Sequence, residues 1–174
     1  LLEVQDLGLD FETESGTAKV LDEVTFSIGE GEVFGLVGET GCGKTVTALS
    51  ILRLLPPNAR IRAGHIRLAG AELLTKAEDE MQRLRGTRIS MVFQDPATSL
   101  NPVFSIGEQI TRVVRAHEDV DRVAAERRAI DLFRRVGLPD PTAVLRSYPH
   151  ELSGGMQQRV MISMALACRP QLLI

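Results

Sequence analysis

The sequence predicts an α/β fold, from the order of its strand-like and helix-like segments and from a glycine-rich turn between two of them. Short apolar runs over residues 1–34 have the alternation of strands. Further along, strand patterns alternate with helical ones, and a helical stretch is inserted over residues 106–136. Strands followed by strand–helix alternation are typical of an α/β domain. We therefore expect one α/β domain over residues 1–174.

Composition and charge exclude several other classes of protein. The chain has 174 residues, of which 44% are hydrophobic and 25% charged, so neither disorder nor a low-complexity structure is expected. The formal net charge is −3, whereas a dedicated nucleic-acid binder usually carries a basic excess. The two cysteines, Cys42 and Cys168, have no metal-type spacing and fit a reduced protein. No apolar run approaches the ~18–20 residues of a membrane-spanning helix.

The first part of the chain predicts an antiparallel sheet that leads into a buried strand. Leu7, Leu9 and Phe11 alternate with other residues, and a second alternating run ends at Ile28. A continuous apolar run then covers residues 33–37 and ends at Gly38. Such a run is typical of a parallel strand that is buried on both faces.

The later elements follow from helical spacing and from the residues that stop it. Pro56 ends one helical pattern, and Gly137 with Pro139 ends another. In the latter, Arg127, Arg128, Arg134 and Arg135 form a charged face that we expect to be solvated. The predicted elements are a helix over 44–55, strands over 66–68 and 89–93, helical structure over 106–136, a loop with a short helix over 140–154, a helix over 156–168 and a strand over 171–174.

A phosphate-binding loop is predicted between the strand over 33–37 and the helix that follows. The pattern G-x-x-x-x-G-K-[ST] is matched by Gly38, Glu39, Thr40, Gly41, Cys42, Gly43, Lys44 and Thr45. The glycines let backbone N–H groups wrap phosphate oxygens, and the helix directs its positive dipole end at the same charge. The lysine supplies a point charge for the phosphates, and the threonine hydroxyl suits Mg²⁺.

A second anion site is predicted where the last helix begins. Ser153, Gly154 and Gly155 combine a hydroxyl with two bare backbone amides at a helix N-terminus. A bound nucleotide needs only one such pocket, so the presence of two anion sites in one chain requires an explanation. If they lie on different faces, a head-to-tail pair of chains would bring the loop from Gly38 of one chain to Ser153 of the other, with nucleotide between them.

Together these residues resemble the nucleotide-binding domain of ATP-binding cassette (ABC) transporters, over essentially the whole chain. The resemblance rests on the phosphate loop, on the signature Leu152–Gly155, and on Gln94 after the strand that ends at Phe93. The segments Phe93–Pro102 and Tyr148–Met156 are similar to the oligopeptide, dipeptide and nickel importer branch. Met156 departs from the glutamine that usually follows the signature, and this departure is itself similar to that branch.

The resemblance implies a role for each matching residue, with ATP and Mg²⁺ as the bound molecules. Phe11 would stack on adenine, although a core phenylalanine on a strand is the alternative. Lys44 would bind phosphates, and Thr45 would bind Mg²⁺. Gln94 would reach Mg²⁺ and the attacking water, while its loop senses the membrane partner; a polar loop glutamine is the alternative. The signature residues Ser153, Gly154 and Gly155 would hold the γ-phosphate bound to a partner chain.

The resemblance also implies an architecture and a place of work. The fold would be a P-loop NTPase of ABC type, with a mixed β-sheet core, an antiparallel N-terminal β subdomain and a helical subdomain. Residues 1–93 and 171–174 would form the core and β part, and residues 94–155 the glutamine loop, helical subdomain and signature. The partners would be a second ABC ATPase subunit, identical or paralogous, and integral-membrane permease subunits at the cytoplasmic face of the inner membrane. No nucleic acid is expected.

Catalytic carboxylates are not found after the last predicted strand. In the family an Asp, a Glu and then a switch histidine follow that strand, and all three would fall beyond Ile174. We therefore expect this to be an incomplete domain that hydrolyses ATP negligibly alone and exposes apolar surface at the strand edge. Two other functions remain open: a DNA-maintenance ABC-type ATPase, against which the spacing from Gly38 to Ser153 argues, and a non-hydrolysing nucleotide-binding module.

Overall fold

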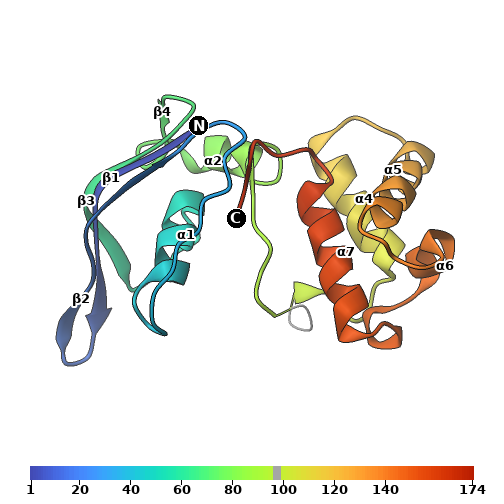
Figure 1. The fold of residues 1–174 in the computed structure, drawn as a ribbon, viewed down its shortest axis with the longest axis horizontal. Helices are drawn as coiled ribbons and strands as arrows, with labels where there is room; N and C mark the ends of the chain where they lie inside the picture. Colours follow the sequence, from blue (N-terminus) through green and yellow to red (C-terminus); the bar gives the residue numbers. More distant parts are fainter. Residues whose placement is uncertain (96–98) are drawn as a thin grey trace. The chain divides into compact units, whose positions relative to one another are not determined.

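The computed structural model describes residues 1–95 and 99–174, which form two compact units, Leu1–Gln82 and Arg83–Ile174 (Figure 1). Pro96, Ala97 and Thr98, part of the segment that resembles peptide importers, lie outside the described residues. Each unit is described by itself below.

The first unit is built on an antiparallel sheet, as the sequence predicts. Its order is β2-β1-β3-β4, with β1 in the interior of the sheet and paired along most of its length with both β2 and β3. The alternating residues Leu7 and Leu9 are fully buried, so the strand pattern does mark the core face. The strands are β1 (Leu2–Thr13), β2 (Gly16–Ile28), β3 (Ala59–Leu68) and β4 (Ala71–Glu72).

An irregularity in β1 bends this sheet. The register shifts between Val4 and Leu7, where Asp6 has a φ of 49°. On the neighbouring strand β3, Gly64 has a φ of 98°, and a Cβ there would lie 2.6 Å from the Asp6 carbonyl oxygen. The close approach of the two backbones therefore requires glycine at this position.

Helix α1 (Lys44–Leu52) follows the glycine-rich loop, as predicted. It ends three residues earlier than expected, at a C-cap residue, Arg53, with a φ of 51°. The Arg53 guanidinium donates hydrogen bonds to the carbonyl oxygens of Leu73 (3.3 Å) and Lys76 (2.5 Å), which ties the helix end to the segment before α2 (Glu78–Leu84).

The strand predicted over residues 33–37 is wrong for this structure. The segment has no strand pairing, and Val33 and Val37 are 98% and 92% exposed. Phe34 stacks on Phe26 of β2 at 5.0 Å between ring centroids. A parallel strand forms only beside neighbouring strands, and no strand among the described residues is paired with this segment.

The second unit is mainly helical. It contains α4 (Ile106–His117), α5 (Arg122–Arg135), α6 (Pro141–Arg146), the 3₁₀ turn η1 (Pro149–Glu151) and α7 (Gly154–Leu166). The stretch predicted as helical over 106–136 is two helices, because Asp121 caps a new helix by accepting a hydrogen bond from the Ala124 N–H. No helix in residues 1–95 and 99–174 is long and apolar enough to span a bilayer.

A short parallel pair of strands, β5 (Ile89–Ser90) and β6 (Leu172–Leu173), belongs to this second unit. Both strands are shorter than predicted. Backbone hydrogen bonds carry the pairing slightly further, since the Val92 N–H donates to the Ile174 carbonyl at 2.8 Å.

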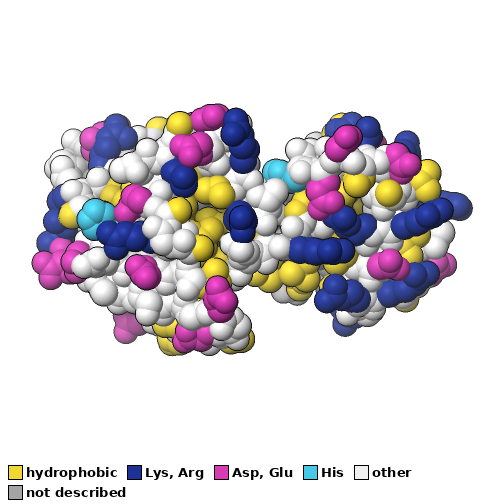
Figure 2. All heavy atoms as spheres, turned by 90° about the horizontal axis from the view of Figure 1, so that it is seen from above, with side chains coloured by type: hydrophobic (Ala, Val, Ile, Leu, Met, Phe, Trp, Pro, Cys, Tyr) yellow, Lys and Arg dark blue, Asp and Glu magenta, His cyan; other side chains and the backbone are white. Residues whose placement is uncertain are grey.

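The helices of the second unit enclose their own core. Its largest fully buried side chain is Phe133 of α5. Arg127, Arg134 and Arg135 are exposed, as predicted, and basic side chains are spread over the visible face of this unit (Figure 2). Arg128 differs, because it bonds both carboxylate oxygens of Glu118 and the Ala167 carbonyl. It therefore holds α5 to the C-terminal ends of α4 and α7, where Glu118 and Ala167 are the C-cap residues, instead of forming part of the solvated face.

Candidate nucleotide-binding site

The glycine-rich loop of the first unit has the backbone geometry of an anion cradle. Gly41 and Gly43 have φ angles of 85° and 96°, in the left-handed region that favours glycine. Gly43 is the N-cap residue of α1, so the free N–H groups of that helix's first turn lie at the end of the loop. Such an N-terminus stabilises negative charge through those N–H groups and the helix dipole.

The end of the loop is packed against strand β2. A Cβ on Gly43 would lie 2.6 Å from Leu21 Cδ2 and 3.5 Å from the Val20 carbonyl oxygen. Gly43 therefore has two constraints, its backbone angle and the absence of room. Leu21 is 3% exposed and belongs to the sheet core, so the core fixes the place where the helix begins.

Lys44 directs its charge into the loop. Its Nζ donates hydrogen bonds to the carbonyl oxygens of Gly38 (2.7 Å) and Glu39 (2.6 Å), and lies 3.6 Å from Cys42 Sγ. The adjacent Thr45 is exposed in the first turn of α1. The site thus offers a lysine cation, bare glycine amides and an exposed threonine hydroxyl. Together these groups fit a nucleotide phosphate with Mg²⁺.

Phe11 lies on the strands that support the loop. Leu9, two residues before it on β1, pairs with Leu21, against which Gly43 packs. Phe11 itself is half-buried and pairs with two small residues, Ala18 on β2 and Ala59 on β3. Large cross-strand neighbours would be expected around a core phenylalanine, so these small ones favour a ring that is available to a ligand.

The signature residues begin helix α7 in the second unit. Ser153 is the N-cap residue, and its Oγ accepts a hydrogen bond from the Met156 N–H at 3.4 Å. Gly154 and Gly155 follow with no positive φ, and a Cβ on either would meet no atom of the described chain within 4 Å. Neither backbone strain nor crowding inside the described chain therefore accounts for these two glycines.

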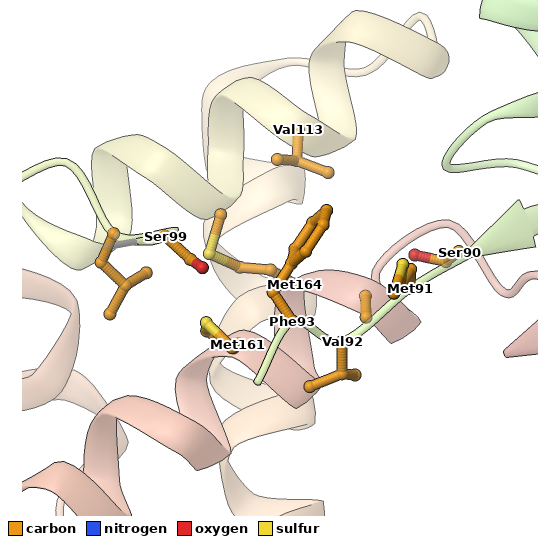
Figure 3. Close-up of a pocket in the computed structure, with 10 residues that line it drawn as sticks. Ser90, Met91, Val92, Phe93, Ser99, Val113, Met161 and Met164 are labelled. Atoms are coloured by element: carbon orange, nitrogen blue, oxygen red, sulfur yellow. The ribbon is translucent and has the colours of Figure 1, made fainter. Parts of the chain in front are cut away.

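Gln94 is exposed and directly follows Phe93, which lines an apolar pocket of the second unit (Figure 3). The pocket has a volume of about 220 Å³ and is formed by the segment after β5, by α4 and by α7. Met161 and Met164, nearly one turn apart on α7, and Val113 on α4 point into it, and Phe93, which also lines it, is 47% exposed. Methionine side chains adapt their shape to the group that they contact.

The predicted site residues thus form two groups. Phe11 and the loop Gly38–Thr45 lie in the first unit, and Gln94 and Ser153–Gly155 lie in the second. Sequence reasoning missed Leu21, which sets the position of Gly43 through a contact that no local pattern reveals. It also missed the methionine pocket, although the spacing of Met161 and Met164 could have indicated a shared helix face.

Known proteins are similar to this chain in sequence. A profile of the ABC transporter family matches residues 21–174. A probable peptide ABC transporter ATP-binding protein of Sinorhizobium fredii is 50% identical over the whole chain, which covers 52% of that relative. The oligopeptide transport ATP-binding protein OppD of Bacillus subtilis is 46% identical, again over the whole chain, which covers 49% of it. The chain therefore spans about half the length of these relatives.

The fold agrees with solved ABC cassettes. The dimeric, ADP- and phosphate-bound structure of the ATP-binding cassette MJ0796 aligns with a TM-score of 0.88 at 23% identity, covering 99% of this chain and 72% of that one. This likeness confirms the predicted fold class, and the sequence relatives add the family itself. The chain belongs to the ABC transporter family.

Proposed function

We propose that this chain is the ATP-binding part of a subunit that hydrolyses ATP to energise an importer of peptides or related solutes. The relatives named above carry peptide and oligopeptide transport in their names, and they match along the whole chain. The glycine loop with Lys44 inside it is the observation that carries the proposal, because it combines every group that phosphate binding requires.

In this function each predicted site residue of the first unit has a defined role. Backbone amides from Gly38 to Gly43 and the Lys44 ammonium bind the phosphates, Thr45 contributes a ligand to Mg²⁺, and Phe11 stacks on the base. Mg²⁺, when bound, neutralises charge on the β- and γ-phosphates. Gln94 would supply an amide oxygen to Mg²⁺ and would orient the attacking water.

The two glycines of the signature support a head-to-tail pair of chains. Glycine is the weakest helix former after proline, so two in succession at the start of a helix need a reason. Gly154 and Gly155 have none inside the described chain, since a Cβ would meet open space on either. A second chain that brings its bound nucleotide against these bare amides supplies that reason. The second chain is identical or paralogous.

The remaining partners would be integral-membrane permease subunits, with this chain peripheral at the cytoplasmic face of the inner membrane. The apolar pocket lined by Phe93, Met161 and Met164 is a suitable contact for such a partner, because its methionines can pack around an inserted side chain. The division into a core part, over residues 1–93 and 171–174, and a helical part, over 94–155, belongs to this proposal.

Nucleotide binding to the purified chain, measured by isothermal titration calorimetry with Mg²⁺ and ATP, tests the proposal. Lys44→Ala should weaken binding at least tenfold, since it removes the only charge bonded inside the loop among the described contacts. Lys76→Ala is the matched control, because Lys76 pairs with Glu80 at 3.1 Å away from the loop. Equal losses in the two variants would refute the assigned phosphate site.

Sedimentation velocity with and without Mg²⁺ and ATP tests the pairing of chains. ATP should shift the chain toward a dimer, and Lys44→Ala should abolish the shift. A chain that binds ATP yet stays monomeric at all concentrations contradicts the head-to-tail arrangement. Salt-sensitive binding to DNA would instead favour the DNA-maintenance alternative.

A further inference from the structure

Gln157 joins the first turns of helix α7 to the turn that precedes the signature. Its Nε2 donates hydrogen bonds to the carbonyl oxygens of Pro149 (2.8 Å) and Leu152 (3.2 Å). The side chain is half-buried, and both acceptor residues are buried. One amide group therefore uses both of its protons on the backbone of a single turn.

These two acceptors bracket the turn η1 and reach the residue directly before Ser153. The Leu152 N–H also donates to the Pro149 carbonyl at 3.1 Å, and the Tyr148 N–H donates to Glu151 Oε2 at 2.7 Å. On the helix side, the Gln157 N–H donates to the Ser153 carbonyl at 2.9 Å. Gln157 thus bonds through its side chain to the backbone before Ser153, and through its own N–H to the carbonyl of Ser153.

We infer that Gln157 is a positioning residue that sets the orientation of the signature toward a partner-bound nucleotide. This inference rests on the proposed function. Gly154 and Gly155 have no side chains with which to hold themselves, and open space surrounds their Cα positions. The direction of Ser153 Oγ and of the two bare amides is therefore fixed by what holds the turn before them. Gln157 is the side chain that spans from α7 to that turn.

The chemistry of this contact requires a donor at position 157. Gln157→Glu keeps the size of the side chain and places a carboxylate opposite two carbonyl oxygens, so both hydrogen bonds become repulsive contacts. Gln157→Lys restores a donor. Gln158→Glu is the matched control, because Gln158 is exposed beside it on α7 and gains the same charge near the same helix N-terminus.

Hydrogen exchange of the full chain, resolved at the hydrogen-bonded amides of Leu152, Met156 and Gln157, measures how firmly this turn is held. Gln157→Glu should speed exchange of these amides about tenfold, as expected for loss of two hydrogen bonds of ordinary strength. Gln157→Lys should restore most of the protection, and Gln158→Glu should leave it unchanged. Unchanged protection in Gln157→Glu, or an equal loss in Gln158→Glu, would overturn the inference.

ATP-dependent dimerisation connects this residue with the proposed function. Gln157→Glu should weaken dimerisation severalfold while calorimetric ATP affinity of the single chain stays the same, because the phosphate loop belongs to the other unit. Dimerisation equal to wild type would show that Gln157 acts only as a structural contact. A wild-type chain that never dimerises would contradict the proposed pairing, and the exchange experiment would still decide the role of Gln157.

Discussion

Single side chains in the proposed site are held mainly by backbone groups. Lys44 bonds to two carbonyls of its own loop, and Gln157 bonds to two carbonyls of the turn before the signature. Arg159 likewise donates to the Val136 (3.1 Å) and Gly137 (2.6 Å) carbonyls at the end of α5. A backbone acceptor survives changes of side chain, so the effect of each substitution should be traceable to the donor itself.

Two roles are open for Phe11, a stack on adenine and a core position on the strand, and two ligands can separate them. Phe11→Leu should lower the affinity for ATP about fivefold, since an aromatic stack is worth roughly 1 kcal/mol, and should leave the affinity for inorganic tripolyphosphate unchanged. Phe11→Tyr should keep both affinities. Calorimetry with the two ligands makes the comparison, and an equal loss for tripolyphosphate would identify Phe11 as a core residue only.

The ion pair between Glu118 and Arg128 makes stability depend on pH. The Arg128 guanidinium, which donates two hydrogen bonds to the carboxylate, lowers the pKa of Glu118 below its ordinary value. A lowered carboxyl pKa stabilises the fold above the ordinary glutamate range, and the stabilisation disappears as the pH falls through the folded-state pKa. Glu118→Gln should cost about 1–2 kcal/mol of unfolding free energy at pH 7, since one partner of a half-buried, charge-assisted pair is lost.

Urea unfolding between pH 3 and pH 7 provides the measurement for this pair. The difference between wild type and Glu118→Gln should shrink as the pH falls below the ordinary glutamate pKa. Glu126→Gln is a suitable control, because its partner Arg122 is 74% exposed and the pair should contribute little. A difference that stays constant with pH would show that packing, not charge, explains the loss.

At the scale of elements, glycines inside helices separate structural from functional positions. A Cβ on Gly107 of α4 would lie 2.6 Å from the Leu145 carbonyl oxygen, so Gly107→Ala should destabilise the chain by about 1–3 kcal/mol through overpacking. Gly154→Ala and Gly155→Ala, in the first turn of α7, should each stabilise it by less than the roughly 1 kcal/mol that alanine gains over glycine in a helix interior, because the new methyl groups meet open space. The same two variants should lose ATP-dependent dimerisation.

Thermal unfolding measures the stability of the three variants, and sedimentation velocity measures their ATP-dependent dimerisation. If the two α7 variants gain stability and lose dimerisation, the two glycines serve a contact with a second chain and not the fold of their own chain. If Gly154→Ala and Gly155→Ala were more stable and dimerised normally, the signature would have no close partner at these positions.

The same elements show which features the sequence could predict. Helices α1 and α7 were predicted close to their observed bounds, because glycine, serine and proline mark helix ends through local chemistry. The loop from Gly38 was predicted for the same reason. The strand over residues 33–37 was not formed, because a parallel strand depends on neighbours that its own residues do not specify. The Gln157 contact escaped prediction because it depends on where distant carbonyls point.

At the scale of the whole molecule, the apolar segment over residues 33–37 is the feature with the largest consequence for handling the chain. Val33 and Val37 are almost fully exposed, Leu36 is 45% exposed, and the phosphate loop follows directly. Contiguous exposed apolar side chains promote association with other chains, whereas isolated ones do not. We expect the purified chain to bind the dye ANS and to self-associate as its concentration rises.

Replacing both valines tests this expectation. The double variant Val33→Thr, Val37→Thr should bind ANS several times more weakly and remain monomeric at higher concentration, with an unfolding free energy within about 0.5 kcal/mol of wild type because neither side chain is part of the core. Val123→Thr is the matched control, since Val123 is 54% exposed on α5 away from this segment. If Val123→Thr lowers dye binding as much as the double variant does, exposed valines in general are responsible. If neither changes it, the segment is covered in solution, and the apolar run that predicted a strand does find a partner.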